Sequence, residues 1–176
     1  MNVKLLRHPT DDDWIECYRR ALITVFGRGI DDVGEPSDKW KKSILRARHS
    51  PIRYLSYSFL ITDIPSNVSV HLCRHVHAQP YVSSLRNDRQ EIMDGDSAPR
   101  STPVNMILDV NAEELMVIAN KRLCNKASEK TREVVRMMRD CVVAVNPEMT
   151  DFLVPMCQYH GGMCHEMHPC GCIAYA

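Results

Sequence analysis

Residues 71–86 read HLCRHVHAQPYVSSLR, with Arg74 and Arg86 twelve positions apart and Ser84 two positions before the second arginine. A guanidinium presents a planar fork of donors that matches phosphate oxygens, and it stays charged at every working pH. The Ser84 hydroxyl is short, so the backbone can hold it close to a ligand. The stretch therefore indicates a site for a phosphate-bearing ligand, although a helix end followed by a solvated basic loop would show the same spacing.

The residues before this stretch predict a strand and then a helix. Residues 54–62 alternate apolar with polar side chains, which predicts one buried face made by Leu55, Tyr57, Phe59 and Ile61. Asp63 and Pro65 then open a helix, whose expected buried face consists of Val68, Leu72 and Val76. Arg74 and His75 would lie near its last turn. Residues 78–103 are polar and predict a long loop, which in a compact domain is usually functional.

The other segments predict two more strands and several helices. Strands are expected at residues 2–7 and 104–110. Helices are expected to start at the acidic run Asp11–Asp13, after Ser37, at Asn111 in a capping-box variant with Glu114, and at Ser128. Glycines Gly27 and Gly29 would end the first helix and Pro147 the last, before a short helix to about Leu153. The last long helix has an apolar stripe of Val134, Met137, Met138, Cys141, Val142 and Val145.

Composition limits the class of protein. The chain has 176 residues, 44% of them hydrophobic, and a formal net charge of zero, which fits one globular domain with a sizeable core. Neutral balance argues against a general nucleic-acid coat protein. No apolar run approaches the roughly 18 residues of a membrane span, and Asp11–Asp13 come too early for a signal peptide. We therefore expect a cytoplasmic protein whose cysteines are thiols or metal ligands rather than disulfides.

The segment from Arg48 to Arg86 resembles the flavin-dependent thymidylate synthases. Their signature runs Arg-His-Arg, then a loop, then Ser-x-Arg, and it is matched here by Arg74, His75, Ser84 and Arg86. The strand ending in Ser-Phe-x-Ile-Thr at residues 58–62 is also similar to the family. A later block of the form Asn-x-Arg-Leu lies at residues 120–123, with Ala127 and Arg132 at the family's spacing. The resemblance covers about residues 2–140.

Three positions of the signature differ. Val76 stands where the third basic residue would be, Tyr81 replaces the usual Asn or Ser, and Val82 replaces the usual Glu or Gln. In terms of the resemblance, Val76 removes one arginine near the flavin phosphates and Val82 removes a polar group near the substrate. Valine forms no side-chain hydrogen bond, so a neighbour must compensate or the affinity falls.

The resemblance implies roles for individual residues. The positions that would hold the nucleotide dUMP are Arg74, Ser84, Arg86 and Arg132. Those that would surround FAD are Ser50, His75, His77, Asn120 and Arg122. The folate-stacking position falls on Arg48, with His49 one residue away. Without the resemblance, Arg122 and Arg132 would be interpreted as a solvated helix face, with Arg132 paired to Glu129 one turn earlier.

The resemblance also implies an activity. It predicts an α/β (α+β) protein with a mixed antiparallel sheet and flanking helices, which converts dUMP to dTMP with FAD, methylenetetrahydrofolate and NADPH. No cysteine with a neighbouring base stands out as a nucleophile, which fits chemistry carried by a flavin. The family's assembly predicts a homotetramer with shared active sites. Two alternatives remain: a dUMP hydroxymethylase of the same fold, and a non-catalytic nucleotide- or metal-binding module.

Residues 154–176 lie outside the resembled core, and we expect a tail distinct from a domain at residues 1–153. Residues 157–172 read CQYHGGMCHEMHPCGC. Their candidate metal ligands are Cys157, Cys164, Cys170, Cys172, His160, His165 and His168. Four cysteines, or three with a histidine, would suit zinc, and thiolates also hold iron–sulfur centres. Free tail thiols, one disulfide, or a small zinc protein with a fortuitous signature remain alternatives. The cysteines at positions 17, 73, 124 and 141 are expected to fill the core.

Overall fold

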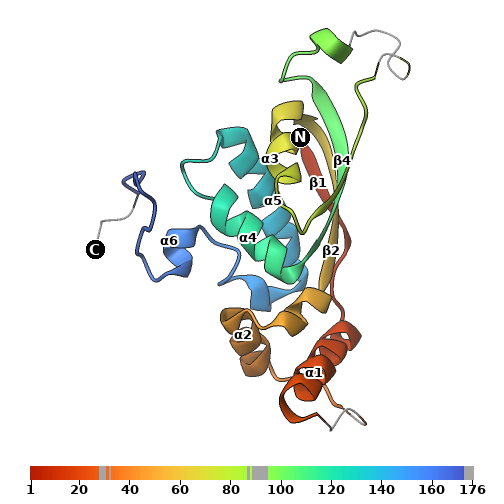
Figure 1. The fold of residues 1–176 in the computed structure, drawn as a ribbon, viewed down its shortest axis with the longest axis vertical. Helices are drawn as coiled ribbons and strands as arrows, with labels where there is room; N and C mark the ends of the chain where they lie inside the picture. Colours follow the sequence, from red (N-terminus) through yellow and green to blue (C-terminus); the bar gives the residue numbers. More distant parts are fainter. Residues whose placement is uncertain (28–30, 32, 87, 89–94, 173–176) are drawn as a thin grey trace.

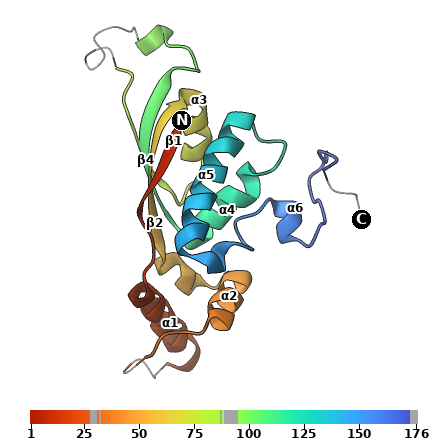
Figure 2. The same ribbon diagram turned by 180° about the vertical axis from the view of Figure 1, so that it is seen from behind.

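The computed structural model describes residues 1–27, 31, 33–86, 88 and 95–172. A four-stranded antiparallel sheet carries helices α3, α4 and α5 on one face, and α1 and α2 lie beyond one end of it (Figures 1 and 2). The expected α/β class with an antiparallel sheet and flanking helices is confirmed. No helix among the described residues has the length and apolar character needed to cross a membrane.

The sheet has the order β1-β2-β4-β3, and every neighbouring pair is antiparallel. Its strands are β1 (Asn2–Arg7), β2 (Ser56–Pro65), β3 (Gln79–Val82) and β4 (Pro103–Asn111). Residue Phe59 of β2 is paired with Leu5 of β1 and Leu108 of β4, so three apolar side chains share the helix-facing side. The predicted strands at residues 2–7 and 104–110 are confirmed, and the predicted strand at 54–62 begins at Ser56 and continues to Pro65.

Strand β3 corrects the prediction of an unbroken loop over residues 78–103. Tyr81 pairs with Ile107 and Gln79 with Asp109, so the start of that segment adds an edge strand to β4. Pro80 has no N–H to donate and is tolerated in an edge strand. The four residues have no clear alternation of their own, and the pairing comes from the open edge of β4.

The predicted helix starts are confirmed by their caps. The Ser37, Asn111 and Ser128 side chains accept hydrogen bonds from the first turns of the helices that follow them. Gly27, at φ 64°, ends the first helix in the left-handed region that glycine adopts without strain. Gly29 lies outside the described residues. The long helices are α1 (Asp11–Phe26), α2 (Asp38–Ala47), α4 (Ala112–Arg122) and α5 (Glu129–Val145).

The short elements lie between the longer helices and strands, or after the last of them. They are the 3-10 turns η1 (Ser50–Tyr54), η2 (Gly95–Ser97) and η3 (Pro147–Met149), and the helices α3 (Ser66–Cys73) and α6 (Met156–Tyr159). The predicted short helix before Leu153 is the single turn η3. Helix α3 ends at Cys73, so Val76 is 82% exposed and does not continue the buried face of Val68 and Leu72.

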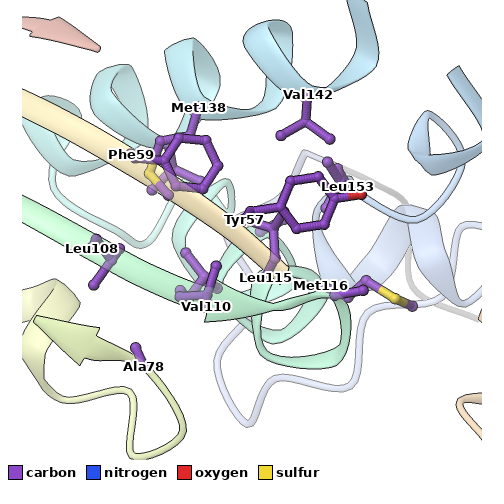
Figure 3. Packing of buried hydrophobic residues seen from close by; sticks show 14 of the residues in the cluster. Tyr57, Phe59, Ala78, Leu108, Val110, Leu115, Met116, Met138, Val142 and Leu153 are labelled. Carbon is purple, nitrogen blue, oxygen red and sulfur yellow. The ribbon is translucent and has the colours of Figure 1, made fainter. Parts of the chain in front are cut away.

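The core lies between the sheet and the helices. Tyr57 and Phe59 of β2 stack with ring centroids 6.5 Å apart, and Met138 and Val142 of α5 lie over them (Figure 3). The predicted apolar stripe of α5 therefore faces the sheet over most of its length. Its last member, Val145, is the final residue of the helix and is exposed.

Candidate functional site

A chain of three polar side chains, two of them buried, connects α4 to the end of α3. Glu114 and His75 are almost completely buried, and His75 Nδ1 lies 3.0 Å from Glu114 Oε1. Arg122 Nε donates to His75 Nε2 at 3.1 Å, and Arg122 Nη2 donates to the His71 carbonyl at 2.9 Å. Since Nε2 accepts from a guanidinium, the proton of the neutral ring is on Nδ1 and is donated to Glu114. The hydrogen bonds from Arg122 to His75 and to the His71 carbonyl hold the Arg122 guanidinium in one orientation.

Burial and charge keep His75 neutral. Desolvation lowers the pKa of His75 and is the largest effect; the Glu114 hydrogen bond opposes it, while the Arg122 charge adds to it. Desolvation also lowers the pKa of Arg122, with the nearby Arg74 charge as the second cause. The pKa of His71 is lowered by desolvation first, and then by the charges of Arg122 and Arg74. Cationic groups are therefore concentrated at the end of α3.

These shifts predict a loss of stability in mild acid. A histidine whose pKa is lower in the folded than in the unfolded chain binds its proton more readily when unfolded. The free energy of unfolding should thus be highest above the unfolded pKa of about 6.5 and fall as the pH drops below it. Urea unfolding at a series of pH values measures this, with the exposed His77→Asn as control. Unchanged stability below this pH would contradict the assignment of a neutral His75.

A hollow of about 410 Å³ lies beside the hydrogen-bonded side chains of Glu114, His75 and Arg122. It is lined by Ser66, Asn67, Val70, His71, Arg74 and Arg100. Arg74 is exposed just after α3, and among the described residues its guanidinium has no recorded hydrogen bond or ion pair. His71 Nδ1 lies 2.8 Å from Thr131 Oγ1 of α5. With Arg122 close enough to respond to the Arg74 charge, the arrangement suits an anion such as a phosphate.

Arg132 is held by backbone carbonyls of the connection between α4 and α5. Its Nη1 donates to the carbonyls of Asn125 at 2.7 Å and Ala127 at 3.1 Å, and its buried Nε has no hydrogen-bond partner among the described residues. The ion pairs of the described residues do not include one between Arg132 and Glu129, so the alternative of a surface charge pair is wrong. The backbone between α4 and α5 therefore fixes the position of the Arg132 guanidinium.

Ser84 and Arg86 lie on a different part of the chain. They follow β3, and the Arg86 guanidinium makes a two-pronged ion pair with Asp88, with both distances 2.9 Å. The Arg86 N–H donates to Ser84 Oγ at 3.2 Å. The hollow that Arg74 lines is not lined by Ser84, Arg86 or Arg132. The proposed nucleotide residues thus do not line one hollow in a single chain.

The remaining flavin and folate candidates lie at three separate places. His77 lines a hollow of about 220 Å³ with Arg53, Asn111, Glu113, Glu114 and Val117. His49 and Ser50 line a larger cavity of about 570 Å³ between α1, α2 and η1. Its walls are mainly apolar and include Ala21, Val25, Trp40 and Ile44.

Arg48 and Asn120 hold the tail against the core. Arg48 Nη2 donates to Asn120 Oδ1, and Asn120 Nδ2 donates to the carbonyls of Phe152 and Val154. Arg48 Nε also donates to the Tyr159 hydroxyl at 3.1 Å, and its guanidinium lies 4.4 Å from the centre of that ring. In this arrangement the polar groups of Asn120 are engaged within the chain.

The cysteine-rich tail lies against α4. Cys124, Cys157, Cys164 and Cys170 line a cavity of about 180 Å³ together with Asn120, Lys121, Met156, His160, His165 and Glu166. All eight cysteines are free thiols. Cys73 is exposed and Cys124 lines this cavity, so the prediction that both fill the core is wrong. Among the described residues, no three His, Cys, Asp or Glu side chains form a ready-made metal cluster.

Four residues at these sites had no functional role in the sequence prediction. They are His71, Arg100, Glu114 and Cys124. Glu114 was expected only as a capping partner, and its backbone N–H does donate to Asn111 while its side chain binds His75. His71 lies one helical turn before His75, and this spacing was the one local signal that it shares the site.

No protein-family model and no curated protein sequence matches the chain. Among solved structures, the chain is similar to the UMP/dUMP methylase PolB from Streptomyces cacaoi bound with 5-Br dUMP, at a TM-score of 0.68 and 15% identity, covering 87% of this chain and 96% of that one. It is also similar to thymidylate synthase X from Helicobacter pylori with FAD and dUMP, at a TM-score of 0.69 and 18% identity, covering 90% and 99%. A second structure of that enzyme with FAD and dUMP gives a TM-score of 0.66 at 19% identity, covering 87% and 98%. The resemblance in sequence is thereby confirmed at the level of architecture, and the chain has the fold of the flavin-dependent thymidylate synthases.

Proposed function

We propose that the protein is a flavin-dependent enzyme that acts on dUMP, and that it forms dTMP by reductive methylation with FAD, methylenetetrahydrofolate and NADPH. The observation that carries the proposal is the pair of cations Arg74 and Arg122 beside His71 at the end of α3, in a fold shared with proteins described with FAD and dUMP. Arg74 belongs to the sequence signature that resembles the family, and Arg122 belongs to the later Asn-x-Arg-Leu block.

The donor set fits anionic ligands. Arg74 offers its whole guanidinium to the hollow, and Arg122 is aimed by His75 and the His71 carbonyl. In the proposal, Arg74, Ser84, Arg86 and Arg132 bind dUMP. Ser50, His75, His77, Asn120 and Arg122 belong to the flavin side, and Arg48 with His49 to the folate side. For Asn120 and Arg48 to contact cofactors directly, their hydrogen bonds to the tail would have to open.

In this mechanism the residues of the protein bind and orient the nucleotide and the cofactors. When bound, the reduced flavin supplies the hydride and methylenetetrahydrofolate supplies the carbon unit. Arginine donors hold the nucleotide phosphate and polarise the uracil carbonyls as negative charge develops on the ring. His75 is neutral and buried, so its contribution is to fix the Arg122 guanidinium rather than to transfer a proton.

A homotetramer with shared active sites is part of the proposal. Its support is that Ser84 and Arg86 do not line the hollow that Arg74 lines, because an active site shared between chains could supply both groups. The sheet face opposite the helices carries Tyr81 (61% exposed) and Ile107 (37% exposed), which are paired across β3 and β4. Light scattering after gel filtration, giving four chains per particle, would support the assembly. A cytoplasmic location belongs to the same proposal.

A hydroxymethyl product is the second candidate. It is favoured by Val76 and Val82, which replace polar residues of the signature, and it uses the same nucleotide site. A non-catalytic binding module is the third candidate, favoured by the engagement of Arg48 and Asn120 with the tail.

One experiment separates the three. The visible spectrum of the purified protein is recorded first. The protein is then mixed anaerobically with dithionite, dUMP and methylenetetrahydrofolate, and the nucleotide product is identified by mass spectrometry. Bound flavin that reoxidises with formation of dTMP would establish the proposed reaction, and hydroxymethyl-dUMP would establish the second candidate. A colourless protein that takes up no added FAD would overturn both and leave the binding module.

A further inference from the structure

The end of the connection between β3 and β4 is fastened to the first turn of α3 (Figure 1). The Ser66 N–H donates to the Thr102 carbonyl at 2.9 Å, and the Asn67 N–H donates to the Arg100 carbonyl at 3.1 Å. Ser66 Oγ also donates to the Arg100 carbonyl, at 2.9 Å. The first N–H groups of a helix have no acceptor within the helix, so these carbonyls satisfy them. The same bonds fix the backbone of Arg100 at the beginning of α3.

The hollow beside α3 has one arginine near each end of the helix. Arg100 is bonded to the first turn, and Arg74 follows the last residue, Cys73. At 1.5 Å of rise per residue, the two backbones are separated along the helix by about 12 Å. Both side chains line the hollow, and the rest of its wall comes from α3 itself.

The walls of the hollow carry positive charge without a counter-charge. The Arg74 and Arg100 side chains are exposed, and within the described part of the chain neither guanidinium forms a hydrogen bond or an ion pair. None of the residues that line the hollow is acidic. A phosphate monoester carries a charge of about −1.5 to −2 at pH 7 and has three acceptor oxygens, so it can accept hydrogen bonds from both guanidiniums.

We propose that Arg100 is a second phosphate-binding residue of this hollow, and that Arg74 and Arg100 together hold the phosphate group of the nucleotide. The identity of the nucleotide rests on the proposed function, whereas the contact with phosphate does not depend on the reaction. The uncharged nucleoside gains nothing from either guanidinium. Arg100 therefore makes the site select a phosphate monoester over the same nucleoside without its phosphate.

Paired binding measurements test this role of Arg100. Calorimetric titrations with dUMP and with deoxyuridine are made on the wild type, on Arg100→Ala and on Arg136→Ala, which removes an exposed arginine of α5 as a control. We expect Arg100→Ala to weaken dUMP binding about tenfold, as for one lost charge-assisted hydrogen bond, and to leave deoxyuridine binding unchanged. Arg136→Ala should bind both as the wild type does. Arg100→Lys keeps the charge without the planar fork and should recover part of the affinity.

The loss must be specific to phosphate. The Arg100 carbonyl, and not its side chain, makes the bonds to α3, so Arg100→Ala should keep the fold. Equal affinity of the wild type and Arg100→Ala for dUMP would overturn the proposal. An equal loss of affinity for dUMP and for deoxyuridine would also overturn it, because Arg100 would then act through the structure of the site.

Inorganic phosphate separates this role from the proposed function. NMR follows the ring of His71, which lines the hollow, during a phosphate titration at constant pH and ionic strength. The wild-type resonances should shift and saturate, and Arg100→Ala should need about tenfold more phosphate for half of the shift. A protein that behaves in this way but binds no dUMP would contradict the proposed function alone. Unshifted wild-type resonances, or the same half-point in both proteins, would overturn the role of Arg100 whether or not dUMP binds.

Discussion

Replacing Glu114 with alanine is expected to lower the free energy of unfolding by about 2 kcal/mol, since it leaves the buried N–H of the neutral His75 without a hydrogen-bond acceptor. Glu114 and His75 are only 6% and 7% exposed. The His75 Nδ1–H would lose its acceptor. Arg122, which bonds to the other side of the His75 ring, would lose a nearby carboxylate. Urea unfolding followed by circular dichroism measures the loss.

The adjacent residue offers a matched control. Glu113 lies on the same helix and forms an ion pair with Arg53, whose side chain is 60% exposed. Exposed pairs contribute about 0–1 kcal/mol, so Glu113→Ala should change stability little. Glu114→Gln retains a hydrogen-bond acceptor and should fall between the two. If Glu113→Ala and Glu114→Ala lower the free energy of unfolding equally, the hydrogen bond between Glu114 and His75 does not have the structural role given to it.

Replacing Arg74 with alanine is expected to weaken dUMP binding about 100-fold, which corresponds to two charge-assisted hydrogen bonds to phosphate. The guanidinium is exposed on the wall of the hollow, so its loss should leave the fold intact. Loss of its charge should also raise the pKa of His71, because Arg74 is one of the groups that lower it. Calorimetric titration with dUMP measures the affinity, and NMR titration measures the histidine.

The controls separate charge from geometry. Arg74→Lys keeps the charge but lacks the planar fork, so it should recover only part of the affinity. Arg46→Ala removes an exposed arginine from the last turn of α2 and should bind dUMP as the wild type does. If Arg74→Ala binds dUMP with unchanged affinity, the hollow beside α3 is not the phosphate site.

Local patterns determined most of the secondary structure. Ser37, Asn111 and Ser128 mark helix starts because a cap bonds to residues within the next turn. The alternation in β2 located its buried face for a similar reason, since neighbouring side chains of a strand point to opposite sides. The signature around Arg74 indicated the family fold, which the solved structures confirm. These features depend on residues close together in sequence, so they are visible before folding.

Only the tertiary structure decided which distant groups meet. His75 and Glu114 are 39 residues apart, and Arg48 and Tyr159 are 111 residues apart. The pairing of β3 with β4 and the meeting of Cys124 with the tail have the same character. Each contact depends on how the helices pack on the sheet and where the tail returns, and no local periodicity encodes that. The sequence by itself therefore determined most of the elements and predicted Arg74 as a phosphate-binding residue, while the packing decided what orients Arg122 and which residues hold the tail.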